Sequence, residues 1–415
     1  MELFDLYNIY KQYPKICIDS RKIIHDSIFF ALKGDSFDGN DYAQIAIDKG
    51  CKYAIIDNPK KKINNNYIVV ENVLDTLQKL ANYHRRTLSI PIIGITGTNG
   101  KTTSKELINC VLKKKFKTYC TAGNFNNHIG VPLSLLEISK KHEIAIIEMG
   151  ANNKNDIKFL CKIAEPEYGI ITNIGKAHLK GFKNIDGVIR TKKEIYDYIK
   201  DRSGKIFINK ANNILTKISQ NIDKISYDSS KYKIKETTPF LKINYSNTII
   251  KTHLIGNYQK ENILLAIRVG EYFKINFTLI KKAVFDYIPQ NNRSQIIKTK
   301  KNFLILDAYN ANPSSTIAML ESFQQQKYSN KLCILGDMLE LGTHSSIEHK
   351  NIVRLTKKLK IAALFIGKEF KKVHSESFSS LNEAIEFIKE KNIKDKTILL
   401  KGSRGVRLEE LIDYL

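Results

Sequence analysis

Short runs of apolar residues alternate with amphipathic stretches along almost the whole chain. In residues 1–88 the apolar runs have strand length and the amphipathic stretches have helical spacing. The expected strands are 16–18, 27–32, 53–56 and 67–70, and the expected helices are 42–49 and 73–86. This pattern predicts a small α/β domain that ends before Ser89-Ile90-Pro91.

The alternation continues over residues 89–291. Apolar runs predict strands at 92–95, 118–121, 144–147 and 169–172, with helices that begin near residues 101, 129 and 186. Nearly continuous apolar strands that alternate with helices are typical of a parallel sheet covered on both faces. After that sheet we expect alternating strands within 241–254 and helices over 259–273 and 277–287.

Residues 292–415 repeat the alternation once more, with strands expected at 303–306, 332–335, 362–366 and 398–400. Asp307, Asp337 and Lys401 follow three of these runs, and right-handed crossovers should bring them to one side of the sheet. The predicted fold class is therefore α/β with three domains. They are a small N-terminal domain (1–88), a central parallel-sheet domain (89–291) and a Rossmann-like C-terminal domain (292–415).

Composition places the chain among ordinary globular proteins, with 415 residues and 42% hydrophobic content. The N-terminus lacks the apolar segment of a secretory signal, and no apolar run reaches the ~20 residues of a membrane span. Six cysteines stand singly, which argues against a zinc site or a disulfide framework and fits a reducing compartment. We therefore expect a cytoplasmic protein with no membrane span.

The net charge of +25 raises the question of nucleic-acid binding. The lysines are scattered over the whole length, and no arginine-rich arm, aromatic RNA-binding motif or zinc finger is present in the sequence. We therefore expect no nucleic-acid partner. A basic field still attracts anionic substrates such as nucleotides.

The loop after the first central strand has the residues of a phosphate-binding loop. Residues 92–105 read IIGITGTNGKTTSK, in which an apolar strand is followed by glycines and the start of a helix. Glycines let backbone amides converge on an anion, and the helix N-terminus adds partial positive charge. Lys101 can reach the β- and γ-phosphates, and the Thr102 hydroxyl can hold Mg²⁺. This loop predicts a P-loop-type ATPase domain, although the spacing is GxxGKT rather than GxxxxGK[ST]. A strand-to-helix turn followed by a surface lysine is the alternative.

Two further side chains follow strands of the same predicted sheet. Glu148 comes directly after the run 144–147, and His178 lies a few residues beyond the run 169–172. Ligands of open α/β sheets gather at the carboxyl ends of the strands, so both are expected beside the phosphate loop. A hydroxyl and a carboxylate suit Mg²⁺ that bridges two phosphates. Taken singly, a solvated glutamate and a packed histidine remain the alternatives.

Together, these motifs resemble those of the Mur ligases, the ATP-dependent amide-forming enzymes of peptidoglycan precursor synthesis. The resemblance runs the whole length and is carried by Asp-Ser-Arg at 19–21, TGTNGKTT at 96–103, EMGAN at 148–152, KKEI at 192–195, YNANP at 309–313, GDMLELG at 336–342 and KGSR at 401–404. The YNANP and GDMLELG strings resemble the branch that joins D-alanyl-D-alanine to UDP-N-acetylmuramoyl-tripeptide through an acyl phosphate.

The resemblance implies a role for each of these residues. Lys101, Glu148, His178 and Lys192 would be catalytic, and Lys192 matches the lysine that the family carbamylates with CO₂. Two Mg²⁺ ions would be held by Thr102, Glu148, His178 and the carbamate of Lys192. ATP would be bound by Gly97, Thr98, Asn99, Gly100, Lys101, Thr102, Thr103, Asn262, Arg293, Asp307 and Asn310. The family often has His-Asn where this chain has Tyr258-Gln259, which leaves the adenine contacts open.

The resemblance also implies how the substrates are held. The first domain would bind the UDP-sugar, and the third would close on ATP and bind the dipeptide. The substrate residues would be Ser20, Arg21, Asn126, Asn127, Asp337, Lys401 and Arg404, although from spacing alone Arg21 is equally a turn residue. We expect a monomer. The alternatives are the sister ligase that adds the third peptide residue, a folate-glutamate ligase, and a basic nucleotide- or nucleic-acid-binding protein without catalysis.

Overall fold

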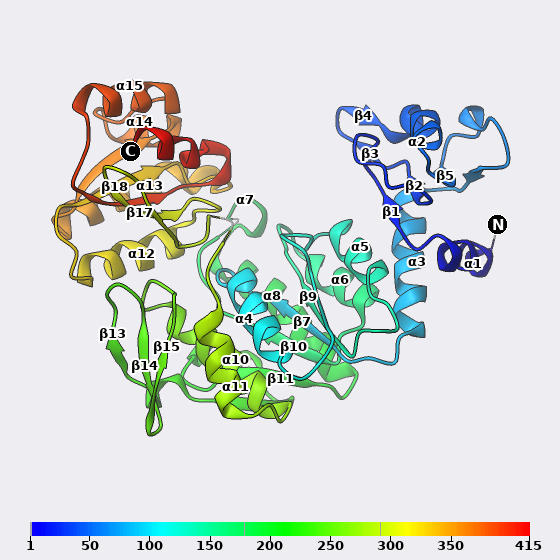
Figure 1. Cartoon of the computed structure of the whole chain (residues 1–415), viewed down its shortest axis with the longest axis horizontal. Coiled ribbons are helices and arrows are strands. Elements are labelled where there is room, and N and C mark those ends of the chain that lie inside the picture. The colour runs from blue at the N-terminus through cyan, green and yellow to red at the C-terminus, as the bar shows by residue number, and fades with distance from the viewer. Residues whose placement is uncertain (1, 178, 291) are drawn as a thin grey trace.

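The computed structural model describes residues 2–177, 179–290 and 292–415. Three α/β lobes follow one another in chain order (Figure 1). We refer to them by the predicted division as the first, central and third domains, and the exact boundaries stay predictions. The predicted α/β class with parallel sheets is confirmed. None of the helices within the described ranges is long and apolar enough to cross a membrane.

The first domain contains a parallel four-stranded sheet of order β1-β2-β5-β6. Every residue of β2 is buried, and each of its neighbours carries β-branched or aromatic side chains that suit a half-buried pleat. A short antiparallel hairpin and two 3₁₀ turns complete the lobe. Its elements are α1 (Leu3–Gln12), β1 (Ile16–Cys17), β2 (Ile28–Phe30), β3 (Lys33–Gly34), β4 (Phe37–Asp38), η1 (Gly39–Tyr42), α2 (Ala43–Asp48), β5 (Tyr53–Ile56), η2 (Pro59–Lys61), β6 (Tyr67–Val69) and α3 (Val73–Thr87).

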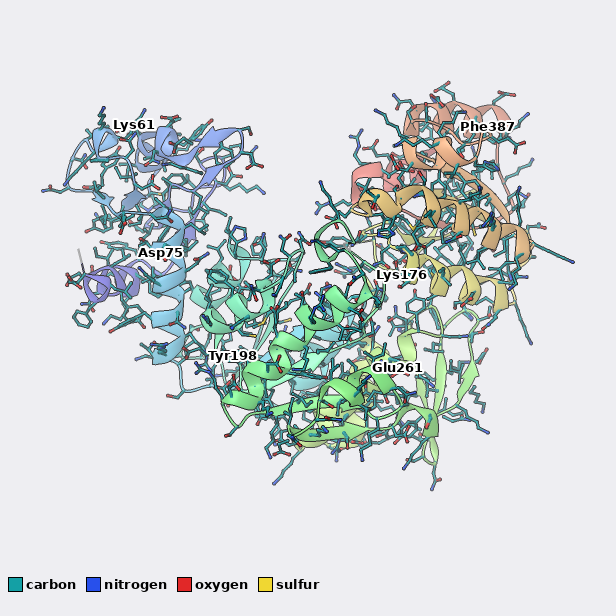
Figure 2. The ribbon with its side chains drawn as sticks, turned by 180° about the vertical axis from the view of Figure 1, so that it is seen from behind. Lys61, Asp75, Lys176, Tyr198, Glu261 and Phe387 are labelled. Carbon is teal, nitrogen blue, oxygen red and sulfur yellow. The ribbon has the colours of Figure 1, made fainter. Side chains whose placement is uncertain are left out.

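Helix α3 joins the first domain to the central one (Figure 1). Leu77 and Leu80 are fully buried in the core cluster that also contains Leu135 and Leu160 of the central domain. At the end of α3 the buried Arg85 donates to the backbone carbonyls of Ala164, Leu88, Ile90 and Glu165 and pairs with Glu167. Viewed from behind, Asp75 marks this helix between the two lobes (Figure 2).

The central domain contains a six-stranded sheet of order β12-β11-β10-β7-β9-β8, and all its strands are parallel. Side chains of β7 alternate between two cores: Ile92 packs with α3, α5, α6 and α8, whereas Ile93 and Ile95 pack with α4, α10 and α11. The predicted sheet covered on both faces is therefore confirmed. The sheet elements are β7 (Ile92–Thr96), α4 (Lys101–Leu112), β8 (Thr118–Cys120), α5 (Gly130–Leu136), β9 (Ile144–Glu148), α6 (Asp156–Ala164), β10 (Tyr168–Ile171), α7 (Leu179–Phe182), α8 (Ile185–Asp201), β11 (Lys205–Asn209), α9 (Asn213–Ile218), β12 (Asp223–Tyr227) and η3 (Ser229–Lys231).

A small antiparallel sheet of order β13-β14-β15 follows, and it packs against the α4 side of the central domain. Its elements and the two helices after it are β13 (Ile234–Glu236), β14 (Lys242–Tyr245), β15 (Thr248–Lys251), α10 (Gln259–Tyr272) and α11 (Phe277–Asp286).

The third domain contains a five-stranded sheet of order β16-β17-β20-β18-β19, in which only β16 is antiparallel. Its parallel strands also alternate between two cores, with α12 and α13 on one side and α15 with the C-terminal turn on the other. Its elements are β16 (Gln295–Lys298), β17 (Phe303–Asp307), α12 (Pro313–Gln325), β18 (Lys331–Gly336), η4 (Gly342–His344), α13 (Ser345–Lys358), β19 (Ala362–Ile366), α14 (Lys368–Val373), α15 (Leu381–Lys391), β20 (Thr397–Lys401), η5 (Arg404–Val406) and η6 (Leu408–Tyr414).

Candidate active site

A cavity of about 780 Å³ lies between the central and third domains. The phosphate loop forms part of its wall, and segments from both domains form the rest. The predicted residues that line it are Thr98, Asn99, Gly100, Lys101, Thr102, Thr103, Asn126, Asn127, Glu148, Asn262, Arg293, Asp307, Asn310, Lys401 and Arg404. The structure therefore brings together most of the predicted site residues from distant parts of the sequence.

The phosphate loop connects the carboxyl end of β7 to the N-terminus of α4. Gly97 has φ +147°, and a Cβ there would lie 1.9 Å from the Thr172 hydroxyl oxygen, so the loop requires glycine at this position. Gly100 has φ +75° and caps α4. The first amides of a helix lack partners within it, so the start of α4 presents donors to an anion in the cavity.

Lys101 occupies the first position of α4, beside this loop. Its Nζ donates to the carbonyls of Gly97 (2.8 Å) and Thr98 (3.3 Å). Burial lowers the pKa of Lys101; the Glu148 charge opposes this shift, and the Arg293 charge adds to it. The ammonium is thus held beside the phosphate loop with little solvation, so an anion bound in the cavity would stabilise its charge.

Glu148, the last residue of β9, is 1% exposed and fully engaged in polar contacts. Its Oε2 accepts a hydrogen bond from Thr102 Oγ1 (2.9 Å), and its Oε1 accepts one from Asn126 Nδ2 (2.8 Å). Lys105 Nζ lies 3.6 Å from Oε2. The carboxylate and the threonine hydroxyl therefore meet at the loop, as predicted from their places at a strand end and a helix start.

Lys105 is a site residue that sequence reasoning missed. It is 1% exposed, and its Nζ donates to the carbonyls of Thr121 (2.6 Å) and Gly123 (2.9 Å) as well as pairing with Glu148. Its position one helical turn after Lys101 was the available signal, because residues four apart share a helix face. The predicted amphipathic helix gave no reason to treat this lysine as buried.

Lys192 lies inside α8 and is 2% exposed. Burial lowers its pKa to about 7, and the positive charge of Lys101 adds to this effect. Its Nζ lies 5.6 Å from the centre of the Phe182 ring. The predicted partner His178 lies outside the described residues, so its place in the metal set stays a prediction.

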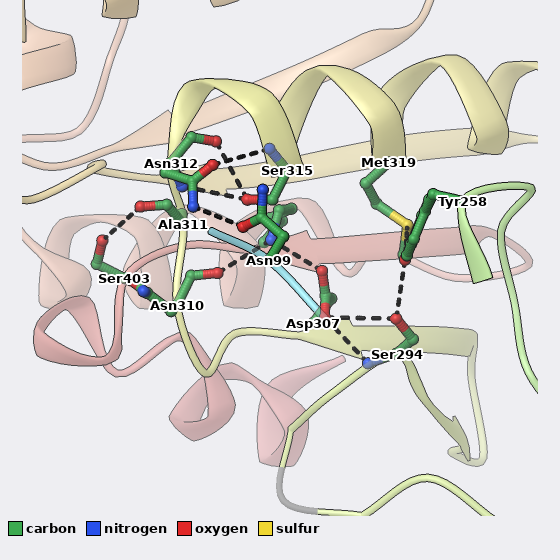
Figure 3. A network of polar contacts seen from close by, with 11 residues as sticks. Asn99, Tyr258, Ser294, Asp307, Asn310, Ala311, Asn312, Ser315, Met319 and Ser403 are labelled. Carbon is green, nitrogen blue, oxygen red and sulfur yellow. Dashed lines mark hydrogen bonds and ion pairs between the residues drawn. The ribbon is translucent and has the colours of Figure 1, made fainter. Parts of the chain in front are cut away.

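The third domain contributes a second set of charges to the cavity. Figure 3 shows Asp307 and Asn310 of this set. Lys401, which is 2% exposed, donates from Nζ to Asp307 Oδ2 (2.8 Å) and to the Asn310 carbonyl (3.0 Å). The guanidinium carbons of Arg293 and Arg404 lie 3.7 Å and 5.9 Å from the centre of the Tyr309 ring. As predicted, the ends of β17 and β20 meet side by side, with Asp307 opposite Lys401 in the sheet register.

The residues that the resemblance associates with adenine binding have hydrogen-bond partners within the chain. Tyr258 OH lies 3.0 Å from Ser294 Oγ, and the backbone amide of Ser294 donates to Asp307 Oδ1 (3.0 Å) (Figure 3). Asn262 Nδ2 donates to Gln259 Oε1 (2.7 Å), and its Oδ1 accepts from the Ser104 hydroxyl (2.9 Å). Tyr258 and Gln259 thus have defined partners beside the phosphate loop and the third domain.

Three of the predicted substrate residues are placed apart from this cavity. Ser20 and Arg21 lie between β1 and β2 of the first domain, where Arg21 pairs with Asp19 (2.8 Å) and is exposed. The Asp337 carboxylate accepts hydrogen bonds from the backbone amides of Glu369 and Phe370 at the start of α14. Its visible task is thus to cap that turn, and its substrate role stays a prediction.

Known proteins resemble the chain over nearly its full length. UDP-N-acetylmuramoyl-tripeptide–D-alanyl-D-alanine ligase of Bacillus subtilis is 31% identical, with 96% of this chain and 92% of that protein covered. The ligase of the same name from Buchnera aphidicola subsp. Baizongia pistaciae is 33% identical with the same coverage. The crystal structure of MurF from Acinetobacter baumannii matches with a TM-score of 0.85 and 28% identity, covering 96% of this chain and 92% of that one.

The three α/β lobes and the phosphate loop on a shared cavity define an enzyme that uses a nucleoside triphosphate. Three family models match in chain order: "Mur ligase family, catalytic domain" over 12–85, "Mur ligase middle domain" over 95–270 and "Mur ligase, glutamate ligase domain" over 292–404. The chain belongs to the Mur ligase family, and it is an ATP-dependent ligase that forms a carbon–nitrogen bond.

Proposed function

We propose that this enzyme joins D-alanyl-D-alanine to UDP-N-acetylmuramoyl-tripeptide in cytoplasmic peptidoglycan precursor synthesis, as a monomer. The relatives that carry the name of this reaction cover 96% of the chain, so the likeness includes all three domains rather than the nucleotide site alone. The observation that carries the proposal is the shared cavity into which the phosphate loop and the third domain both project charged side chains.

The reaction needs such a cavity because a carboxylate does not react with an amine at neutral pH. A carboxylate oxygen of the tripeptide attacks the γ-phosphorus of ATP, the bond to the ADP oxygen breaks, and an acyl phosphate forms. The amine nitrogen of D-alanyl-D-alanine then attacks the acyl carbon, loses its proton, and phosphate leaves. Water must be excluded during these steps, because it would hydrolyse the acyl phosphate.

The chain's own cations suit the first of these steps. Lys101 and the start of α4 face the place where the transferring phosphoryl group would sit, and Arg293 approaches from the third domain. Fixed positive groups lower the free energy of a transition state whose negative charge is spread over the phosphoryl oxygens. Because Arg293 and Lys101 come from different domains, the full charge set exists only when the two domains are together.

The donor set at Glu148 fits magnesium. A buried carboxylate beside the Thr102 hydroxyl offers the hard oxygen ligands that Mg²⁺ takes from proteins, and Asn126 fixes the other carboxylate oxygen. We assign one Mg²⁺ to Thr102 and Glu148, and a second to His178 and the carbamate of Lys192. Bound there, the ions would neutralise charge on the phosphates of ATP.

Lys192 suits carbamylation. Only a neutral amine adds to CO₂, and burial already lowers the pKa of Lys192 to about 7, so a large fraction is neutral at physiological pH. The carbamate would turn a buried cation beside Lys101 into an anion and would supply oxygen ligands. The carbamate would thereby remove the repulsion between the ammonium groups of Lys192 and Lys101. It would also provide a ligand for the second Mg²⁺ of the proposal.

We assign the remaining substrate-binding residues from their positions on the three domains. Ser20 and Arg21 stand on the first domain, which would hold the UDP-sugar, whereas Lys401 and Arg404 stand on the third-domain wall of the cavity, where the dipeptide would enter. Asn126 and Asn127 lie on the central wall, and the Asn127 side chain accepts from the backbone amides of Ile129 and Gly130 to fix that wall.

A phosphate-release assay tests the proposal. With ATP and Mg²⁺, release should require both UDP-N-acetylmuramoyl-tripeptide and D-alanyl-D-alanine, and the tripeptides that carry meso-diaminopimelate and lysine should be compared. Equal release without the dipeptide would count against the proposal. A panel of other amine acceptors separates it from the sister ligase, since the sister ligase would use an amino acid rather than a dipeptide.

A further inference from the structure

The start of α12 in the third domain contacts the phosphate loop of the central domain directly. Asn312 Nδ2 donates to Asn99 Oδ1 at 2.7 Å (Figure 3). The other half of the same side chain stays within the helix, where Oδ1 accepts from the Ser315 amide at 2.9 Å and completes a capping box. Asn312 is 6% exposed, so water competes little for either contact. One side chain therefore caps a helix and joins two domains.

The Asn99–Asn312 contact continues into a second strand end of the central domain. Asn173, which follows β10, accepts the Asn99 amide at 3.0 Å and donates from Nδ2 to the Asn99 carbonyl at 3.0 Å. Thr98 Oγ1 lies within hydrogen-bond distance of both the carbonyl and the amide of Gly175. The phosphate loop and residues 173–175 thus form one hydrogen-bonded unit.

This unit is held by the third domain at a second point. The backbone amide of Lys176 donates to Ser314 Oγ at 2.9 Å, and Lys176 Nζ pairs with Glu348 of α13 at 2.9 Å. Figure 2 shows Lys176 at the junction of the central and third lobes. Three contacts therefore join the central and third domains next to the phosphate loop, and none of them needs a bound ligand.

We infer that Asn312 is a positioning residue that binds Asn99 of the phosphate loop and so holds the third domain against the central domain, in the arrangement that we call closed. Ser314 and Glu348 complete this latch, which we define as the contacts Asn99–Asn312, Lys176–Ser314 and Lys176–Glu348. Because the latch includes Asn99, closure of the third domain depends on the conformation of the phosphate loop. Phosphate binding to this loop and closure of the third domain therefore favour each other. Its effect on turnover rests on the proposed function, but the latch itself does not.

The size of the effect follows from the kind of contact. A neutral hydrogen bond between amide side chains changes an equilibrium by about 2- to 10-fold. Loss of the Asn99–Asn312 contact should therefore lower the ratio of closed to open molecules by about that factor. Where bond formation occurs only in the closed form, kcat falls by up to this factor, and the full factor applies when open molecules predominate. Nucleotide affinity for the open central domain changes less.

Asn312→Ser separates the latch from the helix cap. Serine is as good an N-cap as asparagine, carries no charge, and is too short to reach Asn99. Asn212→Ser is the matched control, because Asn212 caps α9 through the Leu215 amide in the same way, and α9 packs beside β11. Glu348→Gln is a second test of the latch, since it weakens the Lys176–Glu348 ion pair at the outer end.

Hydrogen–deuterium exchange at the Lys176 amide is the direct readout, because its acceptor belongs to the third domain. In the full-length protein with AMP-PNP and Mg²⁺, we expect exchange there to be about 2- to 10-fold faster in Asn312→Ser and Glu348→Gln than in wild type or Asn212→Ser. Unchanged exchange in both latch variants overturns the inference.

Measuring both hydrogen–deuterium exchange at Lys176 and steady-state kinetics distinguishes failure of this inference from failure of the proposed function. If phosphate release proves not to need the tripeptide and dipeptide, the exchange result at Lys176 still decides whether the latch exists. If the reaction is as proposed, kcat of Asn312→Ser should fall by up to about 10-fold while the Kd for AMP-PNP changes less. An equal loss in kcat and nucleotide affinity would assign Asn312 to nucleotide binding instead.

Discussion

Replacing Lys105 by methionine should destabilise the central domain strongly. The Lys105 and Glu148 side chains are 2% and 1% exposed and lie 3.6 Å apart, so water screens their attraction little. Methionine has a similar length, but it leaves the carboxylate without its cation and leaves the carbonyls of Thr121 and Gly123 without their donor.

The magnitude follows from the burial of both charges. Removing one member of a buried ion pair costs about 3–5 kcal/mol, mostly because the other charge is left buried without a partner. For a domain of this size, each kcal/mol lowers Tm by about 2–4 °C, so Lys105→Met should lower Tm by roughly 6–20 °C. Lys113→Met is the matched control, because Lys113 is the exposed C-cap of the same helix.

Thermal unfolding of the full chain measures this effect, and a double-mutant cycle assigns it. Glu148→Gln removes the charge that Lys105 neutralises, so adding it to Lys105→Met should recover part of the lost stability. The reasoning would be refuted if Lys105→Met had the same Tm as the Lys113→Met control. It would also be refuted if the loss of Tm in the double variant equalled the sum of the losses in the two single variants.

Three further predictions concern other groups of the molecule. Lys101→Met should weaken AMP-PNP binding by at least about 10-fold, because a charge-assisted contact to phosphate is lost; isothermal titration measures it, with Lys113→Met as the control. Lys192→Ala should abolish turnover while nucleotide binding is kept, and short-chain carboxylates should restore part of the activity. In the wild-type protein, uptake of ¹³CO₂ by Lys192 should rise as pH rises through about 7, because the neutral amine is the reactive form. Burial lowers the pKa of His84, which binds the Ile138 carbonyl, so its contribution to stability is present above the unfolded pKa of about 6.5 and is lost as pH falls. In His84→Gln the fall of Tm between pH 7 and 5 should therefore be shallower, and an unchanged slope would exclude His84 as its cause.

Much of the fold was predictable because its strands are short apolar runs with clear ends. Residues 53–56 and 362–366 are strands over the predicted ranges, and the helix predicted at 73–86 runs from Val73 to Thr87. The sequence did not indicate α1, whose two tyrosines, Tyr7 and Tyr10, and central Asn8 obscure its periodicity. It also gave no sign of β16, an antiparallel edge strand that contributes only partly buried side chains.

The site was predictable where chemistry is tied to a strand end, and less so where it depends on packing. Glu148 and Thr102 follow elements whose ends the sequence marks, so their meeting was expected and is observed. Lys105 and Asn312 were not singled out, since their partners lie on other elements and only the folded chain brings them together. Asp337 shares the same strand-end signal, yet its carboxylate is turned toward the backbone of α14.

The junction at α3 has a consequence for any attempt to take the enzyme apart. A shortened chain that began at residue 89 would retain the phosphate loop but lose Leu77 and Leu80, and Leu135 and Leu160 would face water in their place. It would also lose the guanidinium of Arg85, which donates to the backbone carbonyls of Ile90, Ala164 and Glu165 around the entry to β7. The first domain thus covers apolar surface of the central, ATP-binding domain. A fragment without the first domain should therefore aggregate rather than function alone.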